Sequence, residues 1–374
     1  MSASHTLIHP FHPANQPNLL AYDEGALTRL VEESGRPRYR ATQILRWLYA
    51  KRARSIDSMT DLSLSDRAWL AAHAAVSGLQ TRLIRTAEDG TKKFLLGLDD
   101  GLVAESVLIP DGRRLTLCVS SQVGCTFDCT FCLTGTLGLS RNLKPHEIVG
   151  QVLAVQDQLD PNSRLSNLVF MGMGEPLANF EAVAESITRL TNTEWGVGFA
   201  PRRITVSTAG LASRIADVAP LGVNLAISLN ATTDAQRAIL MPAVNRSYSL
   251  AALMQACRTF PLKARNRLTF EYVMLAGRND SRADAERLVT LLRGFRCKVN
   301  LIPFNEFPNN SHRRPSDGSV SAFQSVLRRA DLDVFVRKSK GPEVLGACGQ
   351  LGFAAQTAGA GPQPAGLTRH KSDC

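Results

Sequence analysis

Apolar, β-rich runs recur along most of the chain, and segments with a helical spacing of apolar residues lie between most of them. The β-rich runs occupy residues 115–119, 168–171, 204–207, 223–229, 268–275, 299–303 and 334–337. The helix-compatible segments occupy residues 146–159, 180–190, 281–292 and 319–330. Strands that alternate with helices predict an α/β fold with a parallel sheet and right-handed crossovers, open or closed into a barrel.

The first third of the chain has a different pattern. Leu27, Leu30 and Val31 lie at helical spacing, and similar spacing recurs further on, which predicts a small helical module over residues 21–80. Short apolar runs around tight turns predict a short β connector over residues 81–112. The remaining segments are expected to be a flexible leader (residues 1–20), the main barrel (113–355) and a disordered tail (356–374).

The composition is that of an ordinary globular protein, with 44% hydrophobic and 20% charged residues in a chain of 374. No apolar run reaches the roughly 18 to 20 residues that a membrane span needs. The N-terminal segment also lacks the apolar core of a secretory signal. We therefore expect a cytoplasmic protein with no membrane partner.

Charge changes this picture, because the chain carries a net charge of +10 and has a pI near 9.4. A basic surface attracts polyanions, of which nucleic acid is the commonest. Arginine and lysine far outnumber acidic residues over positions 29–54, inside the predicted helical module. This stretch is either a docking surface for a polyanion or a solvated helix face.

Small and polar residues follow the predicted strands in phase. They are Gly124-Cys125 after the first run, Gly172 to Pro176 after the second, Ser207 to Gly210 after the third, Ser228 to Asn230 after the fourth and Asn305 after the sixth. In parallel sheets ligands bind beyond the carboxyl ends of the strands, where these loops gather. The pattern predicts a binding site at that edge.

Cys125, Cys129 and Cys132 form the strongest chemical signal. Three thiolates on one tight loop can hold three irons of a cubane cluster and leave the fourth iron open to a substrate. The alternative is a zinc site, which needs a fourth ligand that the neighbouring sequence does not offer. Among the other cysteines, Cys257 and Cys297 are expected to be small buried hydrophobes, and Cys374 is assigned no role.

This loop resembles the C-x3-C-x2-C signature of the radical S-adenosylmethionine superfamily. Together with its flanks, residues 118–125 and 140–143, it is similar to the RlmN/Cfr family of RNA methyltransferases. Further landmarks of the resemblance are Met171-Gly-Met-Gly-Glu175-Pro176, Val206-Ser-Thr-Ala-Gly210, Ile302-Pro-Phe-Asn305 and Ala347-Cys348-Gly349-Gln350-Leu351. It extends from roughly Arg38 to Phe353, and the order of the motifs makes it specific.

The resemblance implies an incomplete parallel (β/α) barrel with an N-terminal helical RNA-binding module. It also implies a role for individual residues. Cys125, Cys129 and Cys132 match ligands of a 4Fe-4S cluster, and Gly174, Glu175, Ser207, Ser228, Leu229, Asn230 and Asn305 match positions that hold S-adenosylmethionine. Cys348 matches the cysteine that is methylated and carries the methyl group to RNA, Cys118 its resolving partner, and Glu105 a proton acceptor.

The implied reaction puts a methyl group on C2 of an adenosine in 23S ribosomal RNA, with transfer RNA as a second candidate substrate. The ring carbon has no nucleophilic lone pair, so the transfer needs a radical. A reducing electron-transfer protein and a monomeric enzyme are also expected. Methylation at C8, an RNA-binding paralogue without activity and a radical enzyme acting on a small molecule stay open as alternatives.

Departures from the family pattern bear on the substrate. Gly341-Pro342-Glu343 stands where the family has an acidic dipeptide, shortly before the Cys348 motif. The segment from Met241 to Asn245 is one residue longer than usual, and Leu133 replaces a small residue after the last cluster cysteine. None of these positions is a matched ligand, so the radical step is expected to be retained.

Overall fold

The computed structural model describes residues 16–263 and 266–352. Most of the expected leader and the whole expected tail, with Cys374, lie outside the described residues. The α-helices are α1 (Glu24–Glu33), α2 (Tyr39–Leu48), α3 (Leu64–His73), α4 (Leu133–Thr136), α5 (Pro145–Gln156), α6 (Phe180–Thr191), α7 (Asp234–Leu240), α8 (Pro242–Ser247), α9 (Leu250–Thr259), α10 (Arg282–Leu292) and α11 (Asp317–Arg329). The strands are β1 (Gln80–Thr86), β2 (Lys92–Gly97), β3 (Val103–Asp111), β4 (Arg114–Cys118), β5 (Gln122–Gly124), β6 (Leu139–Asn142), β7 (Asn167–Phe170), β8 (Ile204–Thr208), β9 (Asn224–Ser228), β10 (Leu268–Met274), β11 (Cys297–Pro303) and β12 (Asp333–Val336). Short 3-10 helices are η1 (Leu19–Ala21), η2 (Ile56–Ser58), η3 (Pro176–Asn179), η4 (Pro201–Arg203), η5 (Ala212–Leu221) and η6 (Pro342–Val344).

One large sheet organises the molecule, with the strand order β1-β2-β3-β4-β7-β8-β9-β10-β11-β12. Neighbours from β4 to β12 are parallel, whereas β1 to β4 pair antiparallel. The sheet curves as a barrel does, but in the described part of the chain no pairing joins β12 to β1. The barrel is therefore incomplete. The predicted fold class is confirmed.

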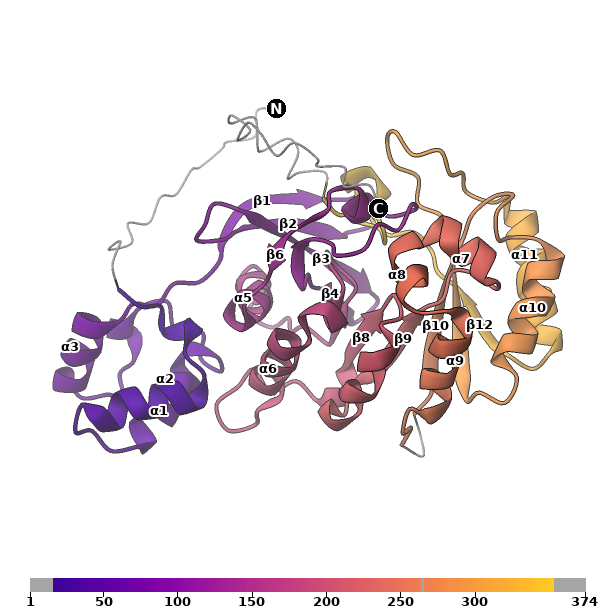
Figure 1. The fold of residues 1–374 in the computed structure, drawn as a ribbon. Coiled ribbons are helices and arrows are strands. Elements are labelled where there is room, and N and C mark those ends of the chain that lie inside the picture. The colour runs from indigo at the N-terminus through magenta and orange to yellow at the C-terminus, as the bar shows by residue number, and fades with distance from the viewer. Residues whose placement is uncertain (1–15, 264–265, 353–374) are drawn as a thin grey trace, which may run out of the picture.

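Helices α5, α6, α9, α10 and α11 lie along one side of the parallel strands (Figure 1). Strands of such a sheet are buried on both faces and read as continuous apolar runs. Phe270 of β10 and Val299 of β11 are typical, because both are fully buried where these two strands pair. The polar loops described below follow the carboxyl ends of these strands and lie at that edge of the sheet.

Side-chain caps set the start of several helices. Ser281 Oγ accepts a hydrogen bond from the Asp284 N–H at 3.1 Å, and the Asp284 carboxylate accepts one from the Ser281 N–H at 3.1 Å, which forms a capping box at α10. Ser249 and Ser316 cap α9 and α11 in the same way without the reciprocal bond. These caps fix the points at which the loops from the strands turn into helices.

Helices α1, α2 and α3 pack on one another beside the barrel, and lie at the indigo end of Figure 1. Leu27 and Leu70 are fully buried in their core. Asp157, at the end of α5, pairs with Arg54 and, at 3.0 Å, with Arg52. The helical part is therefore tied to the barrel by ion pairs as well as by the connecting chain.

The predicted strands and helices agree with the structure to within a few residues at most ends. The run 115–119 corresponds to β4 and the segment 281–292 to α10. Strands β1, β2 and β3, expected as a short connector, pair in sequence with β4 and so extend the barrel sheet. The β5-β6 hairpin and helices α7, α8 and α9 were not predicted, because each is short or lacks a clear period.

Candidate active site

The three cysteines of the loop lie between β5 and α4. Gly124, with φ of +81°, ends β5, and a Cβ atom there would lie 1.9 Å from the Gly138 carbonyl oxygen. The backbone N–H of Cys125 donates to that same oxygen at 3.0 Å. Only glycine permits this close approach, so the β5-β6 hairpin determines where the loop begins.

Cys125, Cys129 and Cys132 are half-buried and pack against an apolar cluster. The cluster consists of Phe127, Phe131, Leu133, Leu240, Met241, Val244, Leu275, Phe304 and Phe307. Burial raises the pKa of the Cys125 thiol to about 12 and that of Cys129 well above its ordinary value. Thiolates in such surroundings need strong positive compensation, which iron supplies.

Among residues 16–263 and 266–352, no group of three or more His, Cys, Asp or Glu side chains is placed to hold one metal ion. A zinc site needs ligands that converge on one ion, whereas each thiolate of a cubane cluster binds a different iron. A loop with three thiolates matches a cluster with one open iron, whereas a zinc ion would need a fourth ligand.

Glu175 lies in the loop that follows β7, where it is the N-cap of η3, and is 3% exposed. Its carboxylate accepts backbone hydrogen bonds from Ala209 at 2.7 Å and Leu177 at 3.0 Å. Burial nevertheless raises its pKa to about 7. Gly174, with φ of +96°, precedes it, and a Cβ there would lie 2.5 Å from Gln122 Cβ. Among the described residues, no basic side chain acts on this buried carboxyl.

Ser207 and Ser228 end neighbouring strands, β8 and β9, and their hydroxyls lie 3.4 Å apart. Leu229 is fully buried, and its N–H donates to the Glu271 carbonyl at 2.9 Å. Asn230 follows in the left-handed region, with φ of +56°. The structure therefore brings these expected S-adenosylmethionine contacts together at one edge of the sheet.

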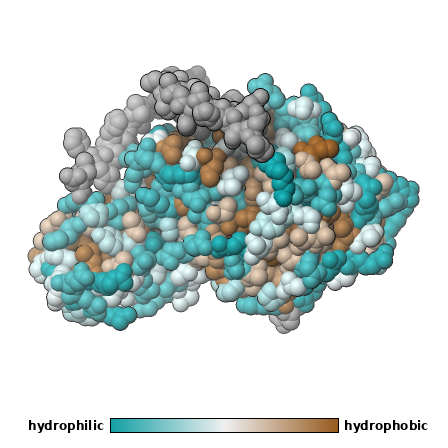
Figure 2. Space-filling model, in the orientation of Figure 1, coloured by the Kyte–Doolittle hydropathy of each residue, from teal (hydrophilic) through white to brown (hydrophobic). Residues whose placement is uncertain are grey.

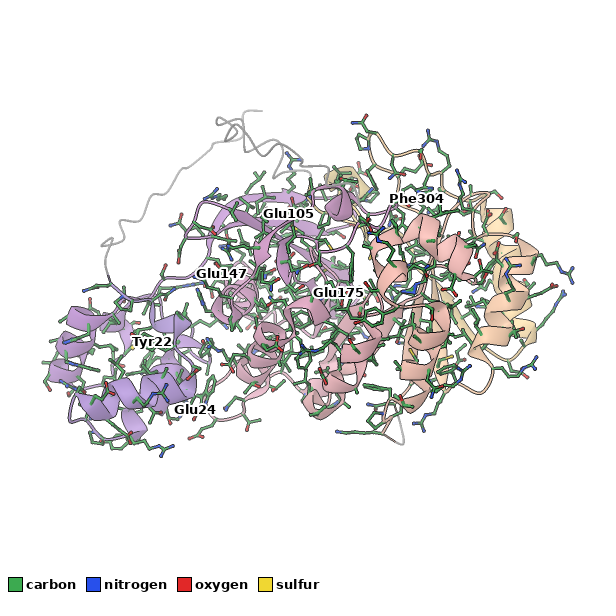
Figure 3. All side chains as sticks on the ribbon, in the orientation of Figure 1. Tyr22, Glu24, Glu105, Glu147, Glu175 and Phe304 are labelled. Atoms are coloured by element: carbon green, nitrogen blue, oxygen red, sulfur yellow. The ribbon has the colours of Figure 1, made fainter. Side chains whose placement is uncertain are left out.

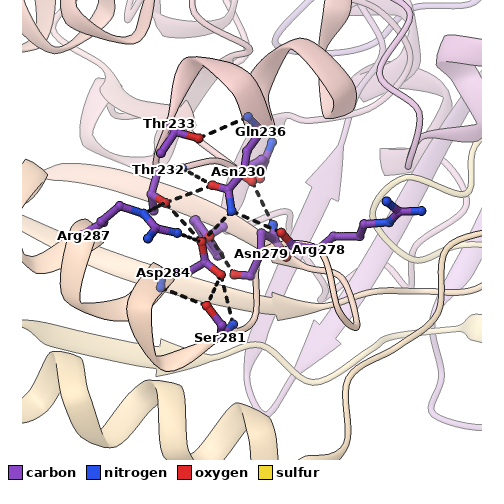
Figure 4. A network of polar contacts seen from close by, with 10 residues as sticks. Asn230, Thr232, Thr233, Gln236, Arg278, Asn279, Ser281, Asp284 and Arg287 are labelled. Carbon is purple, nitrogen blue, oxygen red and sulfur yellow. Dashed lines mark hydrogen bonds and ion pairs between the residues drawn. The ribbon is translucent and has the colours of Figure 1, made fainter.

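A polar network holds the loop at Asn230 (Figure 4). The Asn230 side chain accepts from Val273 N–H at 2.8 Å, and the Asn279 side chain donates to the Asn230 carbonyl at 2.8 Å. Beyond it, Asp284 pairs with Arg287 and accepts from Gln236 at 2.5 Å. The network uses the Asn230 side-chain oxygen and leaves its amide facing Met241 sulfur at 3.6 Å.

Asn305 follows β11 and contacts the C-terminal loop. Its amide donates to the Cys348 carbonyl at 3.1 Å, and its oxygen accepts from Ser339 at 2.5 Å. The N–H of Leu133 donates to the Gly349 carbonyl at 2.7 Å, which joins the same loop to the cysteine loop. Asn305 thus positions the Cys348 loop in this structure.

Cys348 is exposed, and Cys118 is buried at the end of β4. Desolvation raises the pKa of Cys348 to about 11, with the Glu271 charge adding to the effect. Burial raises the pKa of Cys118 well above its ordinary value, and the charge of Cys348 adds to it. Cys118 also packs in one apolar cluster with Leu351. The two cysteines, far apart in the sequence, are both free thiols and lie near enough for the charge of Cys348 to raise the pKa of Cys118.

Glu105, on β3, is fully buried and pairs with the buried Lys93 of β2 at 2.7 Å. Glu105 also accepts from Gly352 N–H at 2.9 Å, and Lys93 donates to the Leu345 carbonyl at 3.3 Å. The ion pair therefore holds the Cys348 loop by hydrogen bonds at Leu345, before the cysteine, and at Gly352, after it. Figure 3 shows Glu105 and Glu175 in the central part of the molecule.

Sequence reasoning assigned no role to Gln122, Glu271 or Arg237, all of which are buried near these loops. Gln122 accepts from Glu175 N–H at 2.9 Å, and Glu271 accepts from Asn300 at 2.8 Å. A charged residue inside the apolar run of β10 was the available signal for Glu271. Cys257 and Cys297 are buried, as expected.

Two departures from the family pattern have structural partners. Glu343 accepts a hydrogen bond from Glu88 N–H at 2.7 Å, which anchors the start of the C-terminal loop on the β1-β2 turn. The longer segment forms α8, where Ala243 N–H donates to Asp128 at 2.9 Å. Leu133 is buried beside the cluster cysteines. Each change therefore supports a loop rather than replacing a site residue.

The basic stretch divides into paired and unpaired residues. Arg36 and Arg40 both pair with Asp66, at 3.0 and 3.2 Å. Within the described residues, Arg38 and Arg46 are exposed and make no ion pair. The face of this part of the molecule in Figure 2 is largely hydrophilic. No helix in the described ranges is long and apolar enough to cross a membrane.

An open parallel barrel with a three-cysteine loop and a buried glutamate at the carboxyl edge defines a radical S-adenosylmethionine enzyme. Comparison with known proteins agrees, because the model of the radical SAM superfamily matches residues 119–289. The model of the ribosomal RNA large subunit methyltransferase N-terminal domain matches residues 17–76. The chain belongs to the RlmN family of radical SAM RNA methyltransferases.

Similarity to individual proteins covers nearly the whole chain. It is 48% identical to the dual-specificity RNA methyltransferase RlmN of Geobacter sulfurreducens, covering 92% of this chain and 94% of that protein. It is 46% identical to the RlmN of an Anaeromyxobacter species, covering 99% of each. The crystal structure of a radical SAM methyltransferase from Sphaerobacter thermophilus has a TM-score of 0.84 and 42% identity, covering 89% of this chain and 98% of that one.

Proposed function

We propose that this protein methylates C2 of an adenosine in 23S ribosomal RNA, and an adenosine in transfer RNA, through an S-methylated cysteine. The observation that carries the proposal is the pair Cys118 and Cys348, brought to one region beside the three-cysteine loop. A small-molecule radical enzyme would need neither this pair nor an RNA-binding module. The RlmN relatives support an RNA substrate.

Cys125, Cys129 and Cys132 would hold a 4Fe-4S cluster, and the apolar residues around them would exclude water. The reduced cluster, when bound, supplies the electron that splits S-adenosylmethionine. Glu175 would pair with the ammonium group of S-adenosylmethionine, which gives its buried carboxyl a cationic partner. Gly174, Ser207, Ser228, Leu229, Asn230 and Asn305 would line the same site.

Cys348 would carry the methyl carbon, because it is the exposed cysteine on a loop fixed to the cysteine loop through Leu133 and Gly349. Addition of that carbon to the base joins RNA to Cys348, and Glu105 would accept the ring proton. Attack by Cys118 on the Cys348 sulfur would break the bond to carbon and leave a disulfide. The released carbon would take up a proton to become the methyl group on RNA, and the surplus electron of the adduct would return to the cluster.

The remaining expectations belong to the same proposal. Residues 21–80 would bind RNA, 81–112 would connect, and 113–355 would carry the catalytic barrel. The enzyme would act as a monomer in the cytoplasm and take electrons from a reducing electron-transfer protein. The exposed Arg38 and Arg46 support the RNA-binding role of the helices, because both are available for phosphates.

Two cysteine variants test the proposal, because they must fail at different steps. Cys348→Ala has no sulfur to methylate and should form neither methylated RNA nor a covalent complex. Cys118→Ala should trap RNA on Cys348 in a species that survives denaturing gels and disappears on RNase digestion. Cys297→Ala, at a buried cysteine on β11, is the matched control and should turn over normally.

A cross-link that persists in Cys348→Ala, or normal turnover by Cys118→Ala, would contradict the assigned roles. Mass spectrometry of the product nucleoside separates C2 from C8 methylation. A C8 product would replace the proposed position but leave the cysteine chemistry intact.

A further inference from the structure

Arg237 is a fully buried arginine on α7, beside the cysteine loop. Its Nη2 donates to the Ala209 carbonyl at 2.7 Å. Nε and Nη1 are buried, and neither has a hydrogen-bond partner among the described residues. Arg237 therefore presents two unused donors inside the protein.

This is an unusual state for a guanidinium, which stays protonated in proteins. A buried charge without a partner costs several kcal/mol. Arg189 of α6, the other buried arginine among the described residues, shows the ordinary solution. It pairs with Glu185 at 2.9 Å and donates to the Leu20 carbonyl at 2.7 Å and to Tyr49 Oη at 2.8 Å. The contrast indicates that Arg237 is completed by an anion from outside the polypeptide.

The packing around Arg237 identifies where that anion lies. Helix α7 ends at Leu240, whose carbonyl accepts from Thr130 N–H at 3.0 Å, within the cysteine loop. Ala209, which accepts the one hydrogen bond of the guanidinium, packs in the same apolar cluster as the three cysteines. The two unused donors therefore lie at the border of the three-cysteine site.

Charge supports the same location. Burial lowers the pKa of Arg237, and the charge of Cys129 is the largest effect that opposes this. Asp234 also opposes it, but Asp234 is exposed and its carboxylate caps Leu250 N–H at 2.7 Å. The buried Cys257 opposes it as well, but less than Cys129 does. The anion that best fits this order is the set of thiolates on the cysteine loop with the sulfides that they would hold.

We propose that Arg237 is the buried counter-charge of the iron-sulfur cluster, and that its unused N–H groups stabilise the cluster in its more negative, reduced state. The inference rests on the proposed function, because it requires a cluster on Cys125, Cys129 and Cys132. Adding an electron increases the negative charge beside the guanidinium, so a nearby fixed cation favours reduction. Arg237 thereby makes the cluster easier to reduce by the electron donor.

The test replaces the charge while keeping the length of the side chain. Arg237→Met is neutral, Arg237→Lys restores the charge, and Arg189→Met is the matched control at a buried but fully partnered arginine. The midpoint potential of the reconstituted cluster is measured by redox titration followed by electron paramagnetic resonance, without S-adenosylmethionine. Arg237→Met should lower the equilibrium constant for reduction at least about tenfold, which is about 59 mV for one electron. Arg237→Lys should recover most of it, and Arg189→Met should not change it.

A second readout is the melting temperature, which requires no activity measurement and is determined first on the cluster-free protein. Removing an unpaired buried charge should leave the melting temperature of the cluster-free Arg237→Met protein equal to or above that of the wild type. Its gain on cluster loading should be smaller. Arg189→Met should lose stability in both forms, because it breaks existing bonds. Failure of a stable Arg237→Met protein to retain iron would also support the proposal.

The outcomes separate this inference from the proposed function. An unchanged potential in a loaded Arg237→Met protein, or a cluster-free variant less stable than the wild type, would overturn the role of Arg237 and leave the cluster intact. A wild-type protein that binds zinc and takes up no iron would overturn the cluster itself.

Discussion

Glu175 should make the stability of the cluster-free protein fall as the pH rises toward neutrality. Its carboxyl is 3% exposed, and burial raises its pKa from the ordinary 4.5 to about 7, although hydrogen bonds from Ala209 and Leu177 oppose the effect. The native state therefore holds a proton between these values that the unfolded chain has released. Stability from this group is complete below pH 4.5 and is lost as the pH rises to about 7.

The size of the effect follows from the two pKa values. One pKa unit corresponds to about 1.36 kcal/mol, so the native state should lose about 2.5 kcal/mol between roughly pH 5 and pH 8 because of Glu175 alone. Glu175→Gln keeps the shape of the side chain but cannot titrate. The difference in free energy of unfolding between wild type and variant should therefore change by that amount over this range.

Urea denaturation of both cluster-free proteins at several pH values measures this difference. Glu181→Gln is the control, because Glu181 is exposed and Arg214 lowers its pKa below the ordinary 4.5. It is ionised in both the native and the unfolded state from about pH 5 to pH 8, so its removal should leave the pH dependence over this range unchanged. Parallel stability curves for wild type and Glu175→Gln would refute the reasoning. Under the proposed function, S-adenosylmethionine should also release a proton on binding near pH 6, because its ammonium favours the ionised carboxylate.

Two further predictions come from the charged pairs. Lys93→Met should destabilise the protein by about 3–5 kcal/mol, because it removes the ammonium from the buried Glu105, and adding Glu105→Gln should restore most of the loss in a urea denaturation cycle. If the double variant loses the sum of the stability losses of the two single variants, the ion pair between Lys93 and Glu105 does not couple them and the reasoning is wrong. Arg38→Ala and Arg46→Ala should each reduce the slope of RNA affinity against salt by about 1. Arg40→Ala, at an arginine already paired with Asp66, should lower stability and leave the slope unchanged. If the slope of RNA affinity against salt is the same in all variants, Arg38 and Arg46 belong to a solvated helix face and do not bind RNA.

Local features of the chain could be predicted from the sequence with no tertiary information. Cys125, Cys129 and Cys132 lie close because a tight loop allows little separation. Residues that follow parallel strands, such as Glu175 and Ser207, must gather at one edge because the strands run in one direction. The alternation of strands and helices predicted the parallel sheet for the same reason, since it depends on order along the chain, whereas the incomplete barrel was implied by the family resemblance.

Short elements with weak periodicity escaped prediction. Helix α7 covers only Asp234–Leu240, and the hairpin β5-β6 has strands of three and four residues. Such segments do not form alone, because their few hydrogen bonds do not compensate the loss of chain entropy. They are stabilised by the loops against which they pack, as at the contact between Leu240 and Thr130.

Only the tertiary structure decided which polar residues are buried and what they face. A sequence shows that Lys93, Glu105 and Arg237 are charged, but their environments are built from residues distant in the chain. Lys93 and Glu105 are paired because antiparallel strands bring them together in a closed core, whereas Arg237 is buried without a full set of partners. Packing between residues distant in the chain determines the local dielectric constant and the positions of the partners of each charged group. These two factors set the free-energy cost of burying the charge, and therefore what role the charged residue can have.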